Sequence, residues 1–181
     1  MVLTDRLEIL MGIDGSEGQY DLIKERYSQI ISFAGKYYDI VVVDLDNKIG
    51  NQAVVDIIKI SDIVVAMVSQ RAKQIEKINE IINKKQMLTP EKSVITIGKY
   101  MENTKYNAKN ISRNLLRMRD LINTVPYNSL FFEASQEGKV IDLFLNLMKI
   151  KERDENYFFV QELKRLYQTI KMKLDMLQMI K

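Results

Sequence analysis

The sequence contains no cysteine and no histidine among its 181 residues, and these two absences exclude several classes of chemistry. Without cysteine the chain forms no disulfide and offers no thiolate nucleophile, so a reducing, cytoplasmic setting is expected. Without histidine it lacks the commonest general base, the histidine-assisted serine nucleophile and nearly all zinc sites. Any catalysis would therefore rest on carboxylates, lysines or arginines.

Glycine and proline are also scarce, with seven and two residues, and no stretch rich in either divides the chain. A chain of this length without such a linker is most economically one domain. No apolar run is long enough to span a bilayer. The net charge of +3 is small and is explained by an ordinary solvated surface.

Short apolar runs alternate with amphipathic stretches along most of the chain. The runs predict strands at residues 7–13, 39–45, 63–68, 93–97 and 122–125, and those at 39–45 and 63–68 are expected to be buried on both faces. Helical spacing predicts helices at residues 19–36, 52–60, 71–86, 108–121, 129–150 and 152–180. This alternation predicts an α/β fold with a mainly parallel sheet flanked by helices. We expect residues 1–150 to form the α/β domain and residues 151–181 to form one long amphipathic helix.

Asp44 stands near the end of the 39–45 run, and Gly50 follows it closely. A carboxylate at the end of a buried parallel strand points into the crevice where such sheets bind ligands. Magnesium prefers such hard oxygen ligands, and a glycine lets the backbone approach a phosphate. An aspartate in this position equally serves as a cap of a strand end or of a helix, and spacing alone does not decide between the two.

Four segments in consistent order resemble the MinD/ParA family of deviant-Walker ATPases. They are LEILMGIDGS, YDIVVVDLDNKIG, SDIVVAMVSQRAKQIEK and TVPYNSLFFEASQEGKVIDLF, which together cover roughly residues 5–150. The resemblance implies that Asp44 is the Walker B carboxylate and magnesium ligand and that Gly50 is the switch II glycine. It also places Pro126 and Tyr127 near an adenine pocket. The implied cofactors are ATP and magnesium, and the implied function is a dimerising nucleotide switch in bacterial partition or positioning.

The family's phosphate loop, KGGxGK[ST], has no counterpart in this chain, and Gly98 stands where the family commonly has an adenine-binding asparagine. Without that loop, phosphoryl transfer loses most of its electrostatic stabilisation. We therefore predict a P-loop NTPase fold whose N-terminal phosphate-binding unit is missing, with no ATP hydrolysis by this chain alone and no bound ATP or magnesium. Such a chain is either a fragment of an ATPase or a pseudo-ATPase that interacts with a second copy or another protein.

Residues 99–119 are strongly basic, with Glu102 as the one acidic residue and two interleaved tyrosines. The basic residues are Lys99, Lys105, Lys109, Arg113, Arg117 and Arg119. Such a surface can neutralise phosphates without sequence preference, which predicts an alternative function as a DNA-binding accessory protein. A solvated helix face accounts for the same pattern.

The 152–180 segment has apolar residues at nearly heptad spacing. This spacing predicts that the helix packs on the domain or on a partner. Acidic residues interspersed along the segment argue against binding to a membrane surface.

Overall fold

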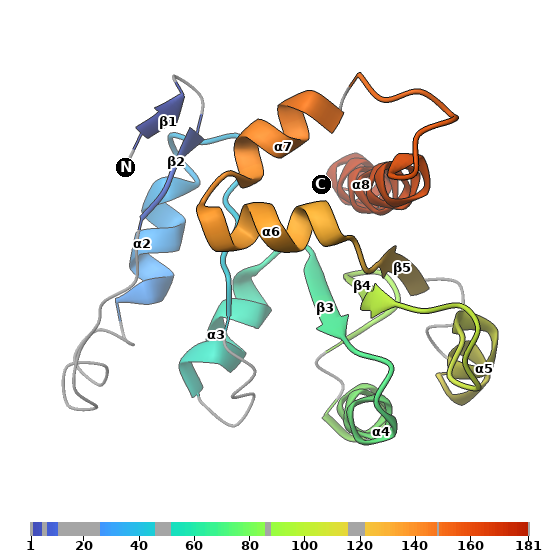
Figure 1. Cartoon of the computed structure of the whole chain (residues 1–181). Helices are drawn as coiled ribbons and strands as arrows, with labels where there is room; N and C mark the ends of the chain where they lie inside the picture. The colour runs from blue at the N-terminus through green and yellow to red at the C-terminus, as the bar shows by residue number, and fades with distance from the viewer. Residues whose placement is uncertain are drawn as a thin grey trace. The chain divides into compact units, whose positions relative to one another are not determined.

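The computed structural model describes residues 2–4, 7–10, 26–45, 52–85, 88–115, 122–147 and 149–180. It divides the chain into two compact units, residues 1–60 and residues 61–181, which are described separately (Figure 1). The predicted α/β class is confirmed by a parallel sheet flanked by helices and by a long C-terminal helix. The predicted division into residues 1–150 and 151–181 stays a prediction.

The first unit contains a small antiparallel pair and two helices. Strand β1 (Val2–Thr4) pairs with β2 (Leu7–Glu8), and the helices are α2 (Tyr27–Ala34) and α3 (Gln52–Ile60). The helix predicted at residues 52–60 is confirmed. Of the helix predicted at residues 19–36, the described part is helical up to Ala34, and the backbone N–H of Gly35 caps it by donating to the carbonyl oxygen of Ile31 at 2.9 Å.

The strand predicted at residues 39–45 is wrong. These residues lie in neither a helix nor a strand, and Ile40 and Val42 are 70% and 88% exposed. β-branched residues favour an extended backbone, but they form a strand only when a neighbouring strand accepts their hydrogen bonds and covers their side chains. The apolar pattern at residues 39–45 indicates an extended backbone. It does not indicate whether a neighbouring strand is there to pair with the segment.

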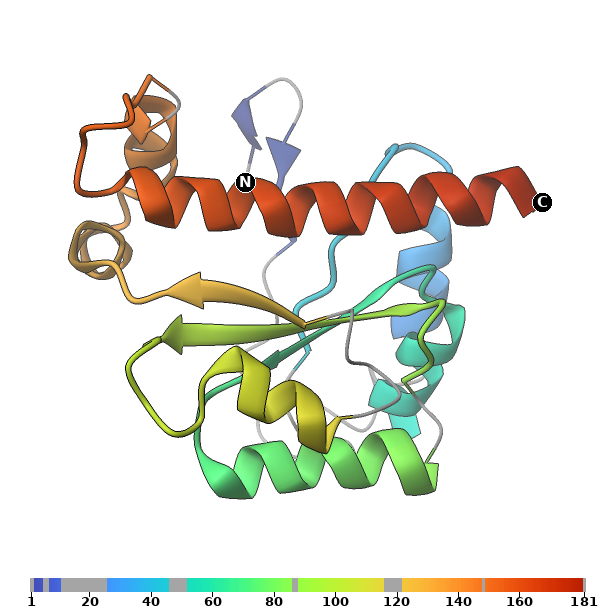
Figure 2. The same ribbon diagram turned by 90° about the vertical axis from the view of Figure 1, so that its right-hand side faces the viewer.

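The second unit contains three parallel strands in the order β3-β4-β5. Strand β3 (Val64–Val68) leads to α4 (Ala72–Glu80) and the π-helical turn η1 (Ile81–Lys85), β4 (Ser93–Tyr100) leads to α5 (Ala108–Asn114), and β5 (Ile122–Pro126) follows. Helices α4 and α5 lie on one face of this sheet (Figure 2). Neighbouring parallel strands with right-handed connections require both connecting helices on the same face.

Strand β4 is the centre of the core of this unit. Its residues Val94, Ile95 and Ile97 are completely buried, because strands cover both of its edges and helices cover both of its faces. Strand β3 was expected to be buried on both faces as well, and this expectation is wrong: Val65 and Met67 are 37% and 65% exposed. The reason is position, since β3 is the outer strand of the described sheet.

The last part of the unit consists of α6 (Ser129–Glu137), α7 (Val140–Leu147) and α8 (Tyr157–Ile180). The segment at residues 129–150 was predicted to be helical with an interruption by glycine, and this is confirmed: Gly138, whose φ of 69° suits glycine, ends α6. Helix α8 lies across the face of the sheet opposite α4 and α5, packed mainly on β5 (Figure 2). Phe159 and Val160 anchor its first turns in a small core with Leu147.

Candidate nucleic-acid interface

The three parallel strands end at one edge of the sheet, and this carboxyl edge is where open α/β sheets bind ligands. The arrowheads of β4 and β5 point to it in Figure 2, and the connection to α5 and the start of α6 leave from it. Three segments form the edge: residues 69–71 after β3, residues 101–107 after β4, and residues 127–128 after β5. The edge therefore brings together residues that are far apart in the sequence.

Gln70 holds the 101–107 segment in place from the neighbouring strand. Its Nε2 donates to the carbonyl oxygens of Met101 at 2.8 Å and of Tyr106 at 3.0 Å, and lies 3.2 Å from Thr104 Oγ1. Its Oε1 accepts from the backbone N–H of Met101 at 2.8 Å. One side chain thus binds both ends of the segment. Sequence reasoning missed Gln70, because a glutamine after a strand has no pattern that distinguishes it from a surface residue.

The start of α5 is also fixed to the sheet. The hydroxyl of Tyr100, the last residue of β4, accepts from the backbone N–H of Ala108 at 3.1 Å. Asn107 caps the helix, with its Oδ1 accepting from the backbone N–H of Asn110 at 3.0 Å. These contacts set the direction in which α5 leaves the carboxyl edge.

Lys99 has a left-handed backbone conformation, with a φ of 51°, at the irregularity between Gly98 and Tyr100 in the pairing of β4 with β5. This conformation is unfavourable for a residue with a Cβ atom, by about 1 kcal/mol or more. The side chain of Lys99 is exposed. Strained residues of this kind gather at functional sites, so Lys99 supports the assignment of this edge as a candidate site.

Four exposed cations, which we call the basic edge, lie on the 99–113 stretch: Lys99, Lys105, Lys109 and Arg113. Lys105 Nζ lies 5.2 Å from the centre of the Tyr106 ring, and an Arg113 guanidinium nitrogen lies 3.4 Å from Asn110 Oδ1. Lys109 and Arg113 are four residues apart on α5 and so share a face of the helix. Within the described part of the chain, none of the four forms a salt bridge. Two further predicted cations, Arg117 and Arg119, lie outside the described residues.

Of the residues predicted for nucleotide binding, Pro126 ends β5 at the carboxyl edge and Tyr127 follows it with 53% of its surface exposed. Asp44 belongs to the first unit, where it is exposed in the segment that forms no strand. Gly50 lies outside the described residues. The structure therefore brings Pro126 and Tyr127 to the sheet edge and leaves Asp44 without the strand end that the Walker B assignment requires.

The position of Asp44 does not match the Walker B role that the resemblance implies. In nucleotide-binding sheets the ligand lies at the carboxyl ends of the strands, whereas Asp44 lies on an exposed segment that forms no strand. Across the described ranges, no group of three or more acidic residues is placed to hold a metal ion.

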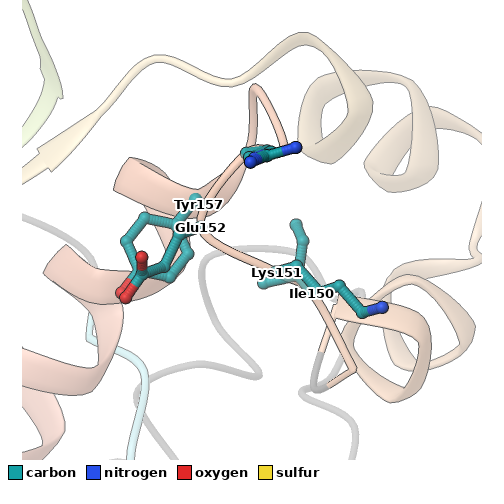
Figure 3. A pocket seen from close by; sticks show the side chains of 5 residues that line it. Ile150, Lys151, Glu152 and Tyr157 are labelled. Atoms are coloured by element: carbon teal, nitrogen blue, oxygen red, sulfur yellow. The ribbon is translucent and has the colours of Figure 1, made fainter.

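An open depression of about 530 Å³ lies along the connection between α7 and α8. It is lined by Ile150, Lys151, Glu152, Arg153 and Tyr157. Figure 3 shows Lys151 extending away from Glu152 and Tyr157, so the ammonium of Lys151 and the carboxylate of Glu152 do not converge on one point. The depression therefore lacks the convergent polar groups of a small-molecule site.

Comparison of the chain with protein-family models, with curated proteins and with solved structures finds no match. Among the described helices, none combines the length and the apolar character needed to cross a membrane.

Proposed function

We propose that this chain is a nucleic-acid-binding protein that contacts the phosphate backbone, without sequence preference, through the basic edge. The observation that carries the proposal is the set of four exposed cations on one continuous stretch, none of them paired with a carboxylate in the described structure. An unpaired cation releases the counterions of a phosphate without first breaking an ion pair. Four of the DNA-binding residues predicted from the sequence are thus available for this role, and the fifth, Arg117, lies outside the described residues.

The fixed backbone around the cations also supports the proposal. Gln70 binds the 101–107 segment, and Tyr100 and Asn107 hold the first turn of α5. Because the segment is already ordered, binding a ligand costs less conformational entropy than ordering a free loop would. Contacts made from the end of one strand and from one helix face suit a regular ligand such as a phosphate backbone.

The proposal is tested by fluorescence anisotropy with a labelled duplex of arbitrary sequence at low salt. We expect binding that is insensitive to sequence and that weakens steeply as salt is added. Absence of binding at low salt, to this duplex and to a single strand alike, would overturn the proposal.

A second candidate is the MinD/ParA-like nucleotide switch, acting in bacterial partition or positioning as a dimer or with a partner protein. Two observations favour it: the resemblance, and a parallel sheet with the strand-helix alternation of nucleotide-binding folds. In this reading the chain is a fragment or a pseudo-ATPase, and it does not hydrolyse ATP alone. Equilibrium binding of ATP with magnesium tests the nucleotide switch, and retained binding would favour it. ATP turnover that disappears in Asp44→Ala would contradict the prediction that the chain is inactive alone.

A further inference from the structure

Exposed apolar side chains stand beside the basic edge, and phosphate binding gives them no role. Met101, Tyr127 and Phe132 are 61%, 53% and 47% exposed, and we call them the apolar platform. Single exposed apolar residues are ordinary on a protein surface, whereas neighbouring ones mark a binding surface.

The sheet places the members of the platform together. Tyr100, the last residue of β4, is paired with Pro126, the last residue of β5, so Met101 and Tyr127 directly follow the ends of two adjacent strands. The ring of Phe132, on α6, lies 6.4 Å from that of Tyr127, with an angle of 39° between the ring planes. The platform therefore extends from the end of β4 across the end of β5 to the first turn of α6.

The platform and the basic edge are continuous in the chain. Lys99 precedes Met101 by two residues, and Lys105 follows it within the segment that Gln70 holds. Two exposed carboxylates, Glu102 and Glu133, stand next to Met101 and Phe132 in the sequence, so the charge of this surface is not uniformly positive. We therefore expect phosphates to bind at the individual cations. Binding of a single strand requires cations for its phosphates and exposed rings on which its bases stack, and this surface offers both.

We infer that the carboxyl edge binds single-stranded nucleic acid in preference to a duplex, with unpaired bases stacked on Tyr127 and Phe132 and phosphates bound by the basic edge. This inference rests on the proposed function and specifies its ligand. In a duplex the faces of the bases are stacked on one another and cannot reach a protein ring, whereas an unpaired base offers its face freely.

The inference is tested with three labelled probes of equal length: a single-stranded oligothymidine, a duplex, and a single strand of abasic residues. The abasic strand keeps the phosphates and removes the bases. We expect the oligothymidine to bind at least about tenfold more tightly than the abasic strand, since each stacked base contributes about tenfold, and more tightly than the duplex. Equal affinity for the oligothymidine and the abasic strand would overturn the inference.

Substitution of the central ring gives the second test. Tyr127→Ala should reduce the affinity for oligothymidine by about tenfold and leave the affinity for the abasic strand unchanged, while Tyr127→Phe should retain binding because the ring remains. Tyr167→Ala is the matched control, since Tyr167 is a 62% exposed tyrosine on α8. An equal loss of affinity for both probes in Tyr127→Ala would contradict stacking.

The two proposals fail in different ways. If none of the probes binds at low salt, the proposed function itself is wrong. If all three bind with the same affinity and the same salt dependence, phosphate binding stands and only the single-strand inference is wrong.

Discussion

Two stretches of the second unit carry clusters of cations, and they differ in what surrounds the charges. Residues 99–113 contain Lys99, Lys105, Lys109 and Arg113 with one acidic residue, Glu102. Residues 149–155 contain Lys149, Lys151 and Arg153 together with Glu152, Asp154 and Glu155. The two stretches differ in net charge, +3 against zero.

Both stretches are tied to the rest of the unit, so order alone does not distinguish them. Gln70 holds the first. In the second, Asp154 Oδ1 accepts from the backbone N–H of Asn156 at 2.8 Å, and Asn128 donates to Asn156 Oδ1 at 2.6 Å. What differs is the proportion of carboxylates, one beside four cations in the first stretch and three beside three in the second, and we expect the surplus of cations to make the first stretch the phosphate-binding surface.

The largest effect is expected from removing cations of the basic edge. The variant Lys105→Ala/Lys109→Ala/Arg113→Ala should lose at least about tenfold in affinity for DNA at low salt, because three phosphate contacts are lost. The control Lys149→Ala/Lys151→Ala/Arg153→Ala changes the net charge by the same amount and should bind nearly as well as the wild type. Anisotropy titrations of both variants make the comparison, and an equal loss in both would show that only net charge matters.

A smaller effect is expected from releasing the 101–107 segment. Gln70→Leu removes the hydrogen bonds to both ends of the segment and should lower the free energy of unfolding by about 1–3 kcal/mol. It should also weaken DNA binding by a few fold, although every cation is retained. Urea denaturation and anisotropy measure the two quantities, with the exposed Gln168→Leu on α8 as the control. Unchanged binding would mean that the order of the segment is irrelevant.

Lys99 separates charge from backbone strain. Lys99→Gly and Lys99→Ala both remove the cation, so both should weaken DNA binding equally. The glycine variant should be the more stable of the two by about 1 kcal/mol, because glycine adopts a φ of 51° without strain. Thermal denaturation distinguishes them, and equal stability would contradict the strained conformation.

The smallest effect concerns Lys173, a buried cation of α8 that belongs to neither stretch. Its side chain is 7% exposed, and its ammonium donates to the carbonyl oxygen of Pro90. Burial lowers the pKa of Lys173 below its usual value, against a smaller opposing effect of Glu91. At pH values between the folded and the unfolded pKa of Lys173, the unfolded chain binds more protons than the folded chain does. The contribution of Lys173 to the free energy of unfolding therefore rises with pH in that range. Lys173→Met should flatten this alkaline rise in chemical denaturation, and an unchanged pH profile would contradict it.

The sequence predicted the parts of the fold that depend on local pattern. The helix at residues 52–60 and the strands at residues 63–68, 93–97 and 122–125 agree with the structure to within a few residues, because apolar spacing decides them. The prediction failed for residues 39–45, because a strand needs a neighbouring strand to pair with, and the apolar pattern of one segment does not show whether such a neighbour exists. It also failed for the exposed faces of Val65 and Met67, since burial depends on whether a strand is central or outermost.

The candidate site divides in the same way. The cations were predictable, because charge is visible in the sequence. Gln70 was not, because its importance comes from contacts with residues 101–106, about thirty positions later, which exist only after β3 and β4 pair. The resemblance predicted that Tyr127 lies near a ligand. The places of Met101 and Phe132 relative to Tyr127 could not be predicted, because they follow from the strand register and from the contact between the two rings.

The salt dependence of DNA affinity tests the central claim most directly. We predict that the logarithm of the affinity falls linearly with the logarithm of the salt concentration, and that Lys105→Ala/Lys109→Ala/Arg113→Ala lowers the slope by about three, close to one for each phosphate contact removed. The triple variant at Lys149, Lys151 and Arg153 should keep the wild-type slope. An unchanged slope in the first variant would contradict the assignment of the basic edge as the phosphate-binding surface.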